Sequence, residues 1–499
     1  MGPSHNDAGT SAGVAQVAVR GMFWTGLAAV ISKLASFAAQ VALGWLLAED
    51  DFAVYALAIS LATIVGAFQH AGLHRVLIHH VTDFSDIARA SLRIAFLCNV
   101  AIALVLFFGA IAAAHYYRQP QLIQVVGPLA IAIPISTFGM VYSAALITRY
   151  RFRDQTRIMV ASTMIRYLSM VTFAFLGLGA LSFVFPLPLI ALYEWIGFRR
   201  AAGALPQSQR SSREVFRNVL RESRWIMLST PAISVSQFGD YLVLGRMGKA
   251  LLAPYFFGYQ LANSFVQPLS AALLNVLVPT FSSIRTESER RAVAFQKSVR
   301  VMMTVFSPVC ICAAFLARDV IDVIWQGKWN SAAYVVQIML LCLPFLTLTP
   351  LAVAILQAIG RWATFGALMW LHALTTVVAA VIGARSGDIV GMVLAICFQH
   401  VMNGVLQVVI AGYYCGITAQ SVIRNAVIPY AVAAGCGLIA LALSWAVGIE
   451  GMAGAIGGGL AAAILMGLGF FTVLRIQAKE IAELVLPQFN RVLKRAPVS

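Results

Sequence analysis

The feature that most limits this chain is its succession of long apolar segments separated by short polar ones. A helix needs about 20 largely apolar residues to cross the hydrocarbon core of a membrane. The sequence meets that requirement fourteen times, at roughly 22–47, 52–73, 92–114, 121–147, 157–177, 179–198, 224–245, 253–281, 298–316, 332–358, 363–383, 388–414, 425–447 and 452–474. We therefore expect an all-α, polytopic membrane protein with about 14 transmembrane helices.

Composition excludes other broad classes. The 499 residues are 60% hydrophobic and 11% charged, whereas an ordinary soluble protein is about 25% charged. A soluble globule of this length cannot bury so much apolar surface, which excludes a soluble enzyme and a disordered chain. The net charge of +16 fits cytoplasmic loops beside anionic lipids better than a nucleic-acid partner. The seven cysteines stand singly in apolar segments and are expected to be small core residues.

The positions of lysine and arginine predict the orientation. With the N-terminus in the cytoplasm, the cytoplasmic segments hold 27 of the 35 basic residues and the external segments hold six. The remaining two, Lys33 and Arg166, lie within predicted spans. The bias alternates from loop to loop as fourteen spans require, so we expect both termini to be cytoplasmic.

Two internal matches predict a repeat. Trp24, Leu43 and Gly44 match Trp225, Leu244 and Gly245 at identical spacing, and Tyr55 and Tyr255 follow at nearly the same distance. Val125, Val126, Pro134 and Thr137 match Val335, Val336, Pro344 and Thr347 in the same way. Both halves would begin in the cytoplasm, which makes them parallel repeats. Transporters built from such repeats bind substrate between the halves.

The repeat predicts two pseudo-symmetric six-helix lobes followed by two further helices. We expect an N-lobe at 1–200, a cytoplasmic amphipathic linker at 201–223 and a C-lobe at 224–415. The last two spans would occupy 424–474, and 475–499 would form a cytoplasmic tail. Ser211 and Glu214 can form a capping box at the start of a surface helix in the linker.

Ionisable side chains inside the predicted spans are the main functional candidates, because burying a charge in a membrane is costly. Lys33 lies eleven residues into the first span, a depth of roughly 16 Å at the helical rise. Arg166 is similarly central in the fifth span, and Asp240 lies in the outer part of the seventh. Two cations and one acid favour an anionic ligand, and a pyrophosphate would require at least two basic partners. Asp240 could instead form a buried ion pair with Lys33 or Arg166.

Amide side chains at helical spacing add candidates for binding polar ligands. They are Gln40 in the first span, Gln237 in the seventh, and Gln260 and Asn263 in the eighth; Gln399, Asn403 and Gln407 follow in the twelfth, with His400 beside them. The alternative for each is a hydrogen bond between helices that stabilises the bundle. The sequence contains no phosphate-binding loop, dinucleotide motif, zinc-protease helix or nucleophile elbow, so we expect no enzymatic activity, no metal and no cofactor.

Two stretches carry a resemblance to a known family. Gly21-Met-Phe-Trp24, Lys33 and the segment from Gln40 to Tyr55 resemble the opening of the Wzx-type polysaccharide transporters. Asp240-Tyr-Leu-Val-Leu-Gly245, Pro254-Tyr255 and Pro279-Thr-Phe-Ser282 are similar to the family's second signature. Ala53 and Pro254 stand where the family commonly has glycine. These flippases belong to the multidrug/oligosaccharidyl-lipid/polysaccharide exporter superfamily, and the sequence is most similar to the exopolysaccharide branch.

The resemblance implies a bacterial inner-membrane protein that flips an undecaprenyl-pyrophosphate-linked oligosaccharide from the cytoplasmic to the periplasmic leaflet by alternating access. Lys33 and Arg166 would attract the pyrophosphate, and the amides of Gln40, Gln237, Gln260 and Asn263 would bind sugar hydroxyls. Asp240 falls on the family's acidic position, where ion coupling, an ion pair and a structural role all stay open. The expected partners are the lipid-linked oligosaccharide, the membrane and a polysaccharide polymerase or co-polymerase, with no nucleic acid. A multidrug cation antiporter and a lipid II flippase are the alternatives.

Overall fold

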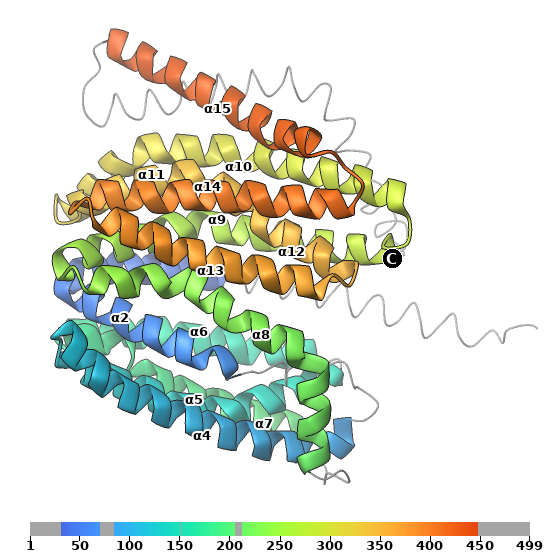
Figure 1. Cartoon of the computed structure of the whole chain (residues 1–499). Coiled ribbons are helices and arrows are strands. Elements are labelled where there is room, and N and C mark those ends of the chain that lie inside the picture. The colour runs from blue at the N-terminus through green and yellow to red at the C-terminus, as the bar shows by residue number, and fades with distance from the viewer. Residues whose placement is uncertain (1–30, 70–83, 150, 205–211, 448–499) are drawn as a thin grey trace, which may run out of the picture. The chain divides into compact units, whose positions relative to one another are not determined.

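The computed structural model describes residues 31–69, 84–149, 151–204 and 212–447, and within these ranges the regular structure is helical (Figure 1). The elements are a helix at Ile31–Leu46, α2 (Glu49–Val65), η1 (Gly66–Phe68), α4 (Phe84–Tyr117), α5 (Gln121–Thr148), α6 (Phe152–Phe175), η2 (Gly179–Phe183), α7 (Pro186–Ala202), α8 (Ser212–Gly245), α9 (Lys249–Ser283), α10 (Ser288–Trp325), α11 (Asn330–Leu346), α12 (Leu348–Ala358), α13 (Trp362–Ala384), α14 (Ile389–Tyr414) and α15 (Ala419–Val447). The all-α, polytopic prediction is confirmed.

Ten segments of the described chain are helical, long and apolar enough to cross a membrane. They coincide with the predicted spans two to six and nine to thirteen. α8 and α9 cover the predicted seventh and eighth spans, and the helix Ile31–Leu46 covers part of the first. The predicted span at 452–474, the tail at 475–499 and the capping residue Ser211 lie outside the described residues.

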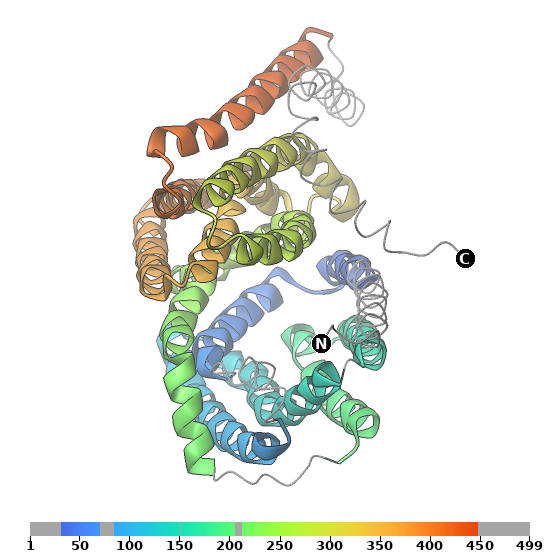
Figure 2. The same ribbon diagram turned by 90° about the vertical axis from the view of Figure 1, so that its right-hand side faces the viewer.

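The chain forms two compact units. The first consists of residues 1–256 and 369–377, and the second of residues 257–368 and 378–499. α9 and α13 therefore each contribute residues to both units. Within each unit, long helices pack side by side, and the view in Figure 2 looks more nearly along several of their axes. The lobe and linker boundaries drawn from the sequence stay a prediction.

α5 is the central helix of the first unit. It packs against α2, α4, α6 and α7, and residues 141–146 are all buried. Half of its most apolar segment is buried inside the protein, against 22% for α4 and 17% for α6. Protein neighbours therefore cover more of α5 than of α4 or α6, whose exposed apolar faces are suited to lipid. Asn99 of α4 donates a 2.7 Å hydrogen bond from Nδ2 to Thr137 Oγ1 of α5, which joins the two helices.

α11 has the equivalent place in the second unit. It packs against α10 and α14, and 67% of the most apolar part of the segment Asn330–Ala358 is buried. Near its end, α14 comes so close that a Cβ on Gly404 would lie only 2.2 Å from the carbonyl oxygen of Phe345. Only glycine fits there, which is the small-residue packing expected between membrane helices.

The residues of the internal matches occupy similar environments. Leu43 and Leu244 are both buried, and the pairs beginning at Val125 and Val335 are buried on the central helices α5 and α11. These burial patterns support the predicted repeat.

Contacts between helices agree with the predicted alternation of sides. Lys249 Nζ lies 3.0 Å from Asp50 Oδ2, and both residues fall in predicted external segments. Gln296 donates a 3.1 Å hydrogen bond to Ser421 Oγ, and both fall in predicted cytoplasmic segments. Each contact therefore joins segments that the distribution of basic residues assigns to one side.

Candidate substrate-binding site

Lys33 lies on the protein-facing side of the helix Ile31–Leu46. Lys33, Ser36 and Gln40 are half-buried, whereas Leu34 is 66% exposed. Because the exposed surface of a spanning helix meets lipid, the apolar residue faces the membrane and the polar face points inward. The structure thus brings the predicted candidates Lys33 and Gln40 onto one sheltered polar face.

Arg166 lies half-buried in the middle of α6. Its guanidinium lies near enough to the hydroxyl of Tyr55 for its positive charge to act on that group. The guanidinium carbon is 5.9 Å from the centroid of the Tyr167 ring. The Nε atom is buried and has no hydrogen-bond partner within the described chain. Arg166 therefore retains donor capacity for a ligand.

Ser162, one turn before Arg166, has a different partner. Its hydroxyl donates a 2.7 Å hydrogen bond to Oε1 of Glu194 on α7. The bond joins α6 to α7 and gives the carboxylate of Glu194 a hydrogen-bond donor.

Asp240 is buried on α8, with 3% of its surface exposed. Its Oδ2 accepts a 2.5 Å hydrogen bond from the hydroxyl of Tyr255, and its Oδ1 accepts a 2.9 Å bond from the backbone N–H of Tyr241. Neither donor is a cation. The interactions of this carboxylate in the described chain thus favour a neutral tyrosine partner over the ion pair considered from the sequence.

An aromatic cluster lies between these two charged side chains in the first unit. We define it as Tyr55, Phe183, Tyr241, Tyr255 and Phe256. Tyr55 stacks on Phe183 at 4.2 Å between centroids, and Phe256 meets Tyr55 at 5.7 Å and Tyr241 at 5.3 Å. Tyr241 in turn meets Tyr255 at 5.6 Å. The cluster fixes both tyrosine rings whose hydroxyls face a charge.

The acidic motif before Tyr55 positions the start of α2. Asp51 Oδ2 accepts a 3.0 Å hydrogen bond from the N–H of Ala48, and its Oδ1 accepts a 2.9 Å bond from the N–H of Ala180. Gly179 has φ +57°, and a Cβ there would lie 2.7 Å from Asp51 Oδ1. One carboxylate therefore caps α2 and holds it against η2, which carries Phe183 of the aromatic cluster.

The other predicted amides are not brought to this cluster. Gln237 lies on α8 but is exposed. Gln260 is exposed and Asn263 is half-buried, and both belong to the part of α9 in the second unit. The polar set of the predicted twelfth span, Gln399, His400, Asn403 and Gln407, is buried in the second unit. In that set, Asn403 donates a 3.1 Å hydrogen bond to the backbone oxygen of Gln399, one turn earlier.

Residue types alone did not single out Tyr55 and Tyr255 as partners of charged groups. The sequence did mark them in another way, since they occupy matching places in the two halves and in the two family signatures. The combination of a repeat match with a nearby intramembrane charge is the signal that points to them.

Comparisons with known proteins agree with this architecture. The chain is 24% identical over 415 residues to the succinoglycan biosynthesis transport protein ExoT of Rhizobium meliloti, covering 78% of this chain and 79% of that one. It is 23% identical over 202 residues to the lipopolysaccharide biosynthesis protein WzxC of Escherichia coli, covering 38% of each.

Solved structures show the same fold. The lipid II flippase MurJ in an inward closed conformation superimposes with a TM-score of 0.70 at 11% identity, covering 91% of this chain and 100% of that one. A MOP superfamily transporter from Pyrococcus furiosus gives a TM-score of 0.58 at 15% identity, covering 79% of this chain and 95% of that one. The profile of one family, described as polysaccharide biosynthesis protein, matches residues 42–334. The chain belongs to this family of polysaccharide biosynthesis proteins.

Proposed function

We propose that this protein is a flippase that moves an oligosaccharide linked to undecaprenyl pyrophosphate from the cytoplasmic to the periplasmic leaflet. The product would feed exopolysaccharide or O-antigen synthesis. The observation that carries the proposal is the pair of half-buried basic residues, Lys33 and Arg166, on membrane helices of the first unit. Asp240, the buried acid of this unit, has tyrosine and backbone donors, so it leaves the positive charge of Arg166 available. A cationic site in a membrane suits an anionic pyrophosphate.

The relatives support the same substrate class. ExoT is named as a transport protein of succinoglycan biosynthesis, and WzxC as a lipopolysaccharide biosynthesis protein. In the proposal, Lys33 and Arg166 bind the pyrophosphate, whereas Gln40, Gln237, Gln260 and Asn263 bind sugar hydroxyls. Asp240 adjusts the local charge as the protein alternates between its inward-open and outward-open states. The protein works as a transporter rather than an enzyme, in the inner membrane with both termini cytoplasmic, beside a polysaccharide polymerase or co-polymerase.

The test uses a clean deletion strain complemented with variants. Lys33→Ala should abolish surface polysaccharide and leave the lipid-linked oligosaccharide on the cytoplasmic leaflet, while the protein still accumulates in the membrane. Leu34→Ala is the matched control, because its side chain is adjacent and faces outward. Normal polysaccharide from the Lys33→Ala strain would remove Lys33 from the site.

The same deletion strain separates the alternatives. Drug sensitivity with intact polysaccharide would favour a multidrug cation antiporter, and arrested cell-wall synthesis would favour a lipid II flippase. Loss of polysaccharide together with a trapped lipid-linked intermediate supports the proposal.

A further inference from the structure

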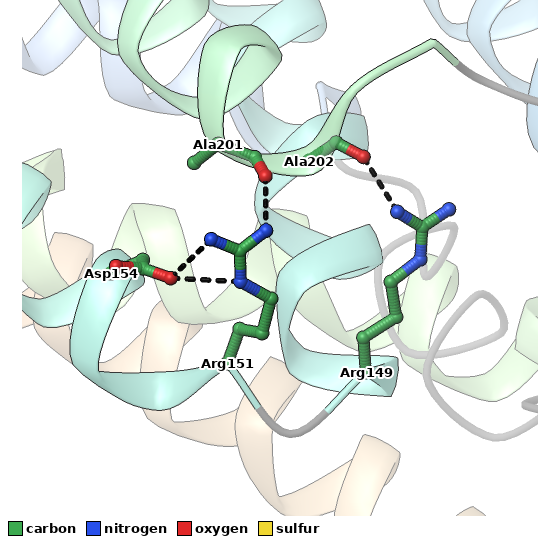
Figure 3. Close-up of polar contacts among 5 residues, drawn as sticks. All are labelled: Arg149, Arg151, Asp154, Ala201 and Ala202. Carbon is green, nitrogen blue, oxygen red and sulfur yellow. Dashed lines mark hydrogen bonds and ion pairs between the residues drawn. The ribbon is translucent and has the colours of Figure 1, made fainter.

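One end of the first unit collects arginine side chains where α5 ends, α6 begins and α7 ends (Figure 3). Arg149 donates a hydrogen bond to the backbone oxygen of Ala202, and Arg151 donates one to that of Ala201. These carbonyls belong to the last turn of α7, which has no partners for them within the helix. Gly203, at φ +76°, ends that helix. Arg149 and Arg151 thus cap α7 and offset the partial negative charge of its C-terminus.

Four other arginines surround this cap without taking part in it. We call Arg153, Arg157, Arg199 and Arg200 the arginine patch. The side chains of all four are exposed, and no ion pair between any of them and another described residue is present. Their charge is therefore not used to hold the helices together.

Packing places the patch at one level along the helices. The carbonyl bonds of Arg149 and Arg151 bring the start of α6 to the end of α7. One turn further along, a Cβ on Gly197 would lie 3.2 Å from the Ile158 side chain. Arg153 and Arg157 on α6 are therefore level with Arg199 and Arg200 on α7.

Acids do little to neutralise the patch. Asp154 is the nearest acid in sequence, and its carboxylate lies 2.6 Å from Arg151 NH2. Glu194 lies more than one helical turn before Arg199 on α7, and its carboxylate accepts the hydrogen bond from Ser162. Trp195, four residues before Arg199, stacks on Phe138 at 4.5 Å between centroids. Tryptophan is typical of the membrane–water boundary, and the distribution of basic residues assigns both segments to the cytoplasmic side, so we place the patch at the depth of lipid headgroups.

We propose that the arginine patch binds the diphosphate headgroup of a polyprenyl lipid carrier at the membrane surface, before the carrier reaches Lys33 and Arg166. This inference rests on the proposed function, which supplies the carrier on the cytoplasmic side. Guanidinium groups bind phosphate oxygens in pairs, and several exposed forks on two adjacent helices suit a group with two phosphates. A phosphodiester lipid carries a single charge and fewer free oxygens, so it engages fewer of these forks.

The test measures binding rather than transport. The full-length protein carries Lys33→Gln and Arg166→Gln, so that the patch is observed alone, and is placed in nanodiscs of phosphatidylcholine. Farnesyl diphosphate is the probe, with farnesyl monophosphate and phosphatidylglycerol as competitors. Arg153→Gln with Arg199→Gln should weaken farnesyl diphosphate binding by about thirtyfold, since each basic residue near the surface contributes about a factor of five.

Two further variants complete the test. Arg285→Gln with Arg424→Gln removes two exposed arginines of the second unit and should leave the affinity unchanged. Arg153→Lys with Arg199→Lys keeps the charge that orients the protein but loses the paired bonds, and should give an intermediate affinity.

Equal weakening by the patch pair and the control pair would overturn the inference. Displacement of farnesyl diphosphate by phosphatidylglycerol or farnesyl monophosphate at equal concentration would also overturn it, because the patch would then be a general anionic surface. The proposed function fails separately, if a Lys33→Ala strain exports polysaccharide normally.

Discussion

The hydrogen bond from Tyr255 to Asp240 allows a quantitative prediction. Tyr255→Phe deletes the hydroxyl and keeps the ring that packs 5.6 Å from Tyr241. Both partners are buried, with exposures of 3% for Asp240 and 0% for Tyr255, and the oxygens are 2.5 Å apart. Hydrogen bonds to charged groups contribute about 1.5–3 kcal/mol, and replacing the donor leaves the carboxylate with the backbone N–H of Tyr241. We expect the free energy of unfolding to fall by about 2 kcal/mol.

A double-mutant cycle isolates this interaction. Unfolding of purified protein in mixed micelles is compared for wild type, Tyr255→Phe, Asp240→Asn and the double variant. If the tyrosine acts on the carboxylate, the loss of unfolding free energy caused by Tyr255→Phe should be smaller in the Asp240→Asn protein than in the wild type. The difference between the two losses should be at least about 1 kcal/mol. Tyr413→Phe, at a ring that is 75% exposed, is the control. An equal effect in both backgrounds would refute the reasoning, since the loss would then come from the ring's surroundings alone.

Three further predictions concern helix ends and helix contacts. Gly179→Ala should lower the free energy of unfolding, measured by denaturant titration, by about 2 kcal/mol, because it strains a left-handed residue and crowds Asp51. Gly177→Ala is the control, because its φ is +80° but the space around it is open, and it should lower the same free energy by only about 1 kcal/mol. Arg149→Ala should speed hydrogen exchange in the last turn of α7 and remove about 1 kcal/mol, and equal protection would contradict its capping role. Asn99→Ala should remove about 0.6–1.7 kcal/mol, with no additional loss when Thr137→Ala is added.

The spans were predictable because the bilayer imposes a constraint that is nearly one-dimensional. Length and apolarity alone decide whether a segment can cross, and the residues between spans decide little. The segment 179–198 is an example, because its length and apolarity predicted a separate span although the link to the preceding span is very short. Gly177 and Gly179 both have positive φ and make that tight reversal possible.

The start of α8 was less predictable. The charges of 212–223 suggested a surface helix separate from the span, yet α8 runs without interruption from Ser212 to Gly245. No glycine or proline stands between Ser212 and Pro231, so nothing in the local sequence ends the helix. Charge patterns report which surface meets water, but they do not report where a helix stops.

The partners of the charged residues could not be obtained from the sequence. A count of the charges within the predicted spans suggested Lys33 and Arg166 as partners for Asp240. The sequence does not give the distances between these residues, so opposite charge was the only criterion available. The partner is instead decided by which side chains meet where α8 ends and α9 begins, and there Tyr255 contacts Asp240 and Phe256 contacts Tyr241. A count of charges does not include an uncharged side chain such as Tyr255, although its hydroxyl oxygen lies 2.5 Å from Asp240 Oδ2.

The two tyrosines that the repeat places in corresponding positions face charges of opposite sign. The Tyr255 hydroxyl donates a hydrogen bond to the buried carboxylate of Asp240, whereas the Tyr55 hydroxyl lies near the positive charge of the Arg166 guanidinium. A phenol can present its hydroxyl hydrogen to an acid and its oxygen to a cation, so one residue type accommodates charges of either sign within the aromatic cluster. Within the described residues the hydrogen bonds of Asp240 come from Tyr255 and from a backbone N–H, so this acid is not paired with Arg166, whose charge the proposed function assigns to an anionic substrate.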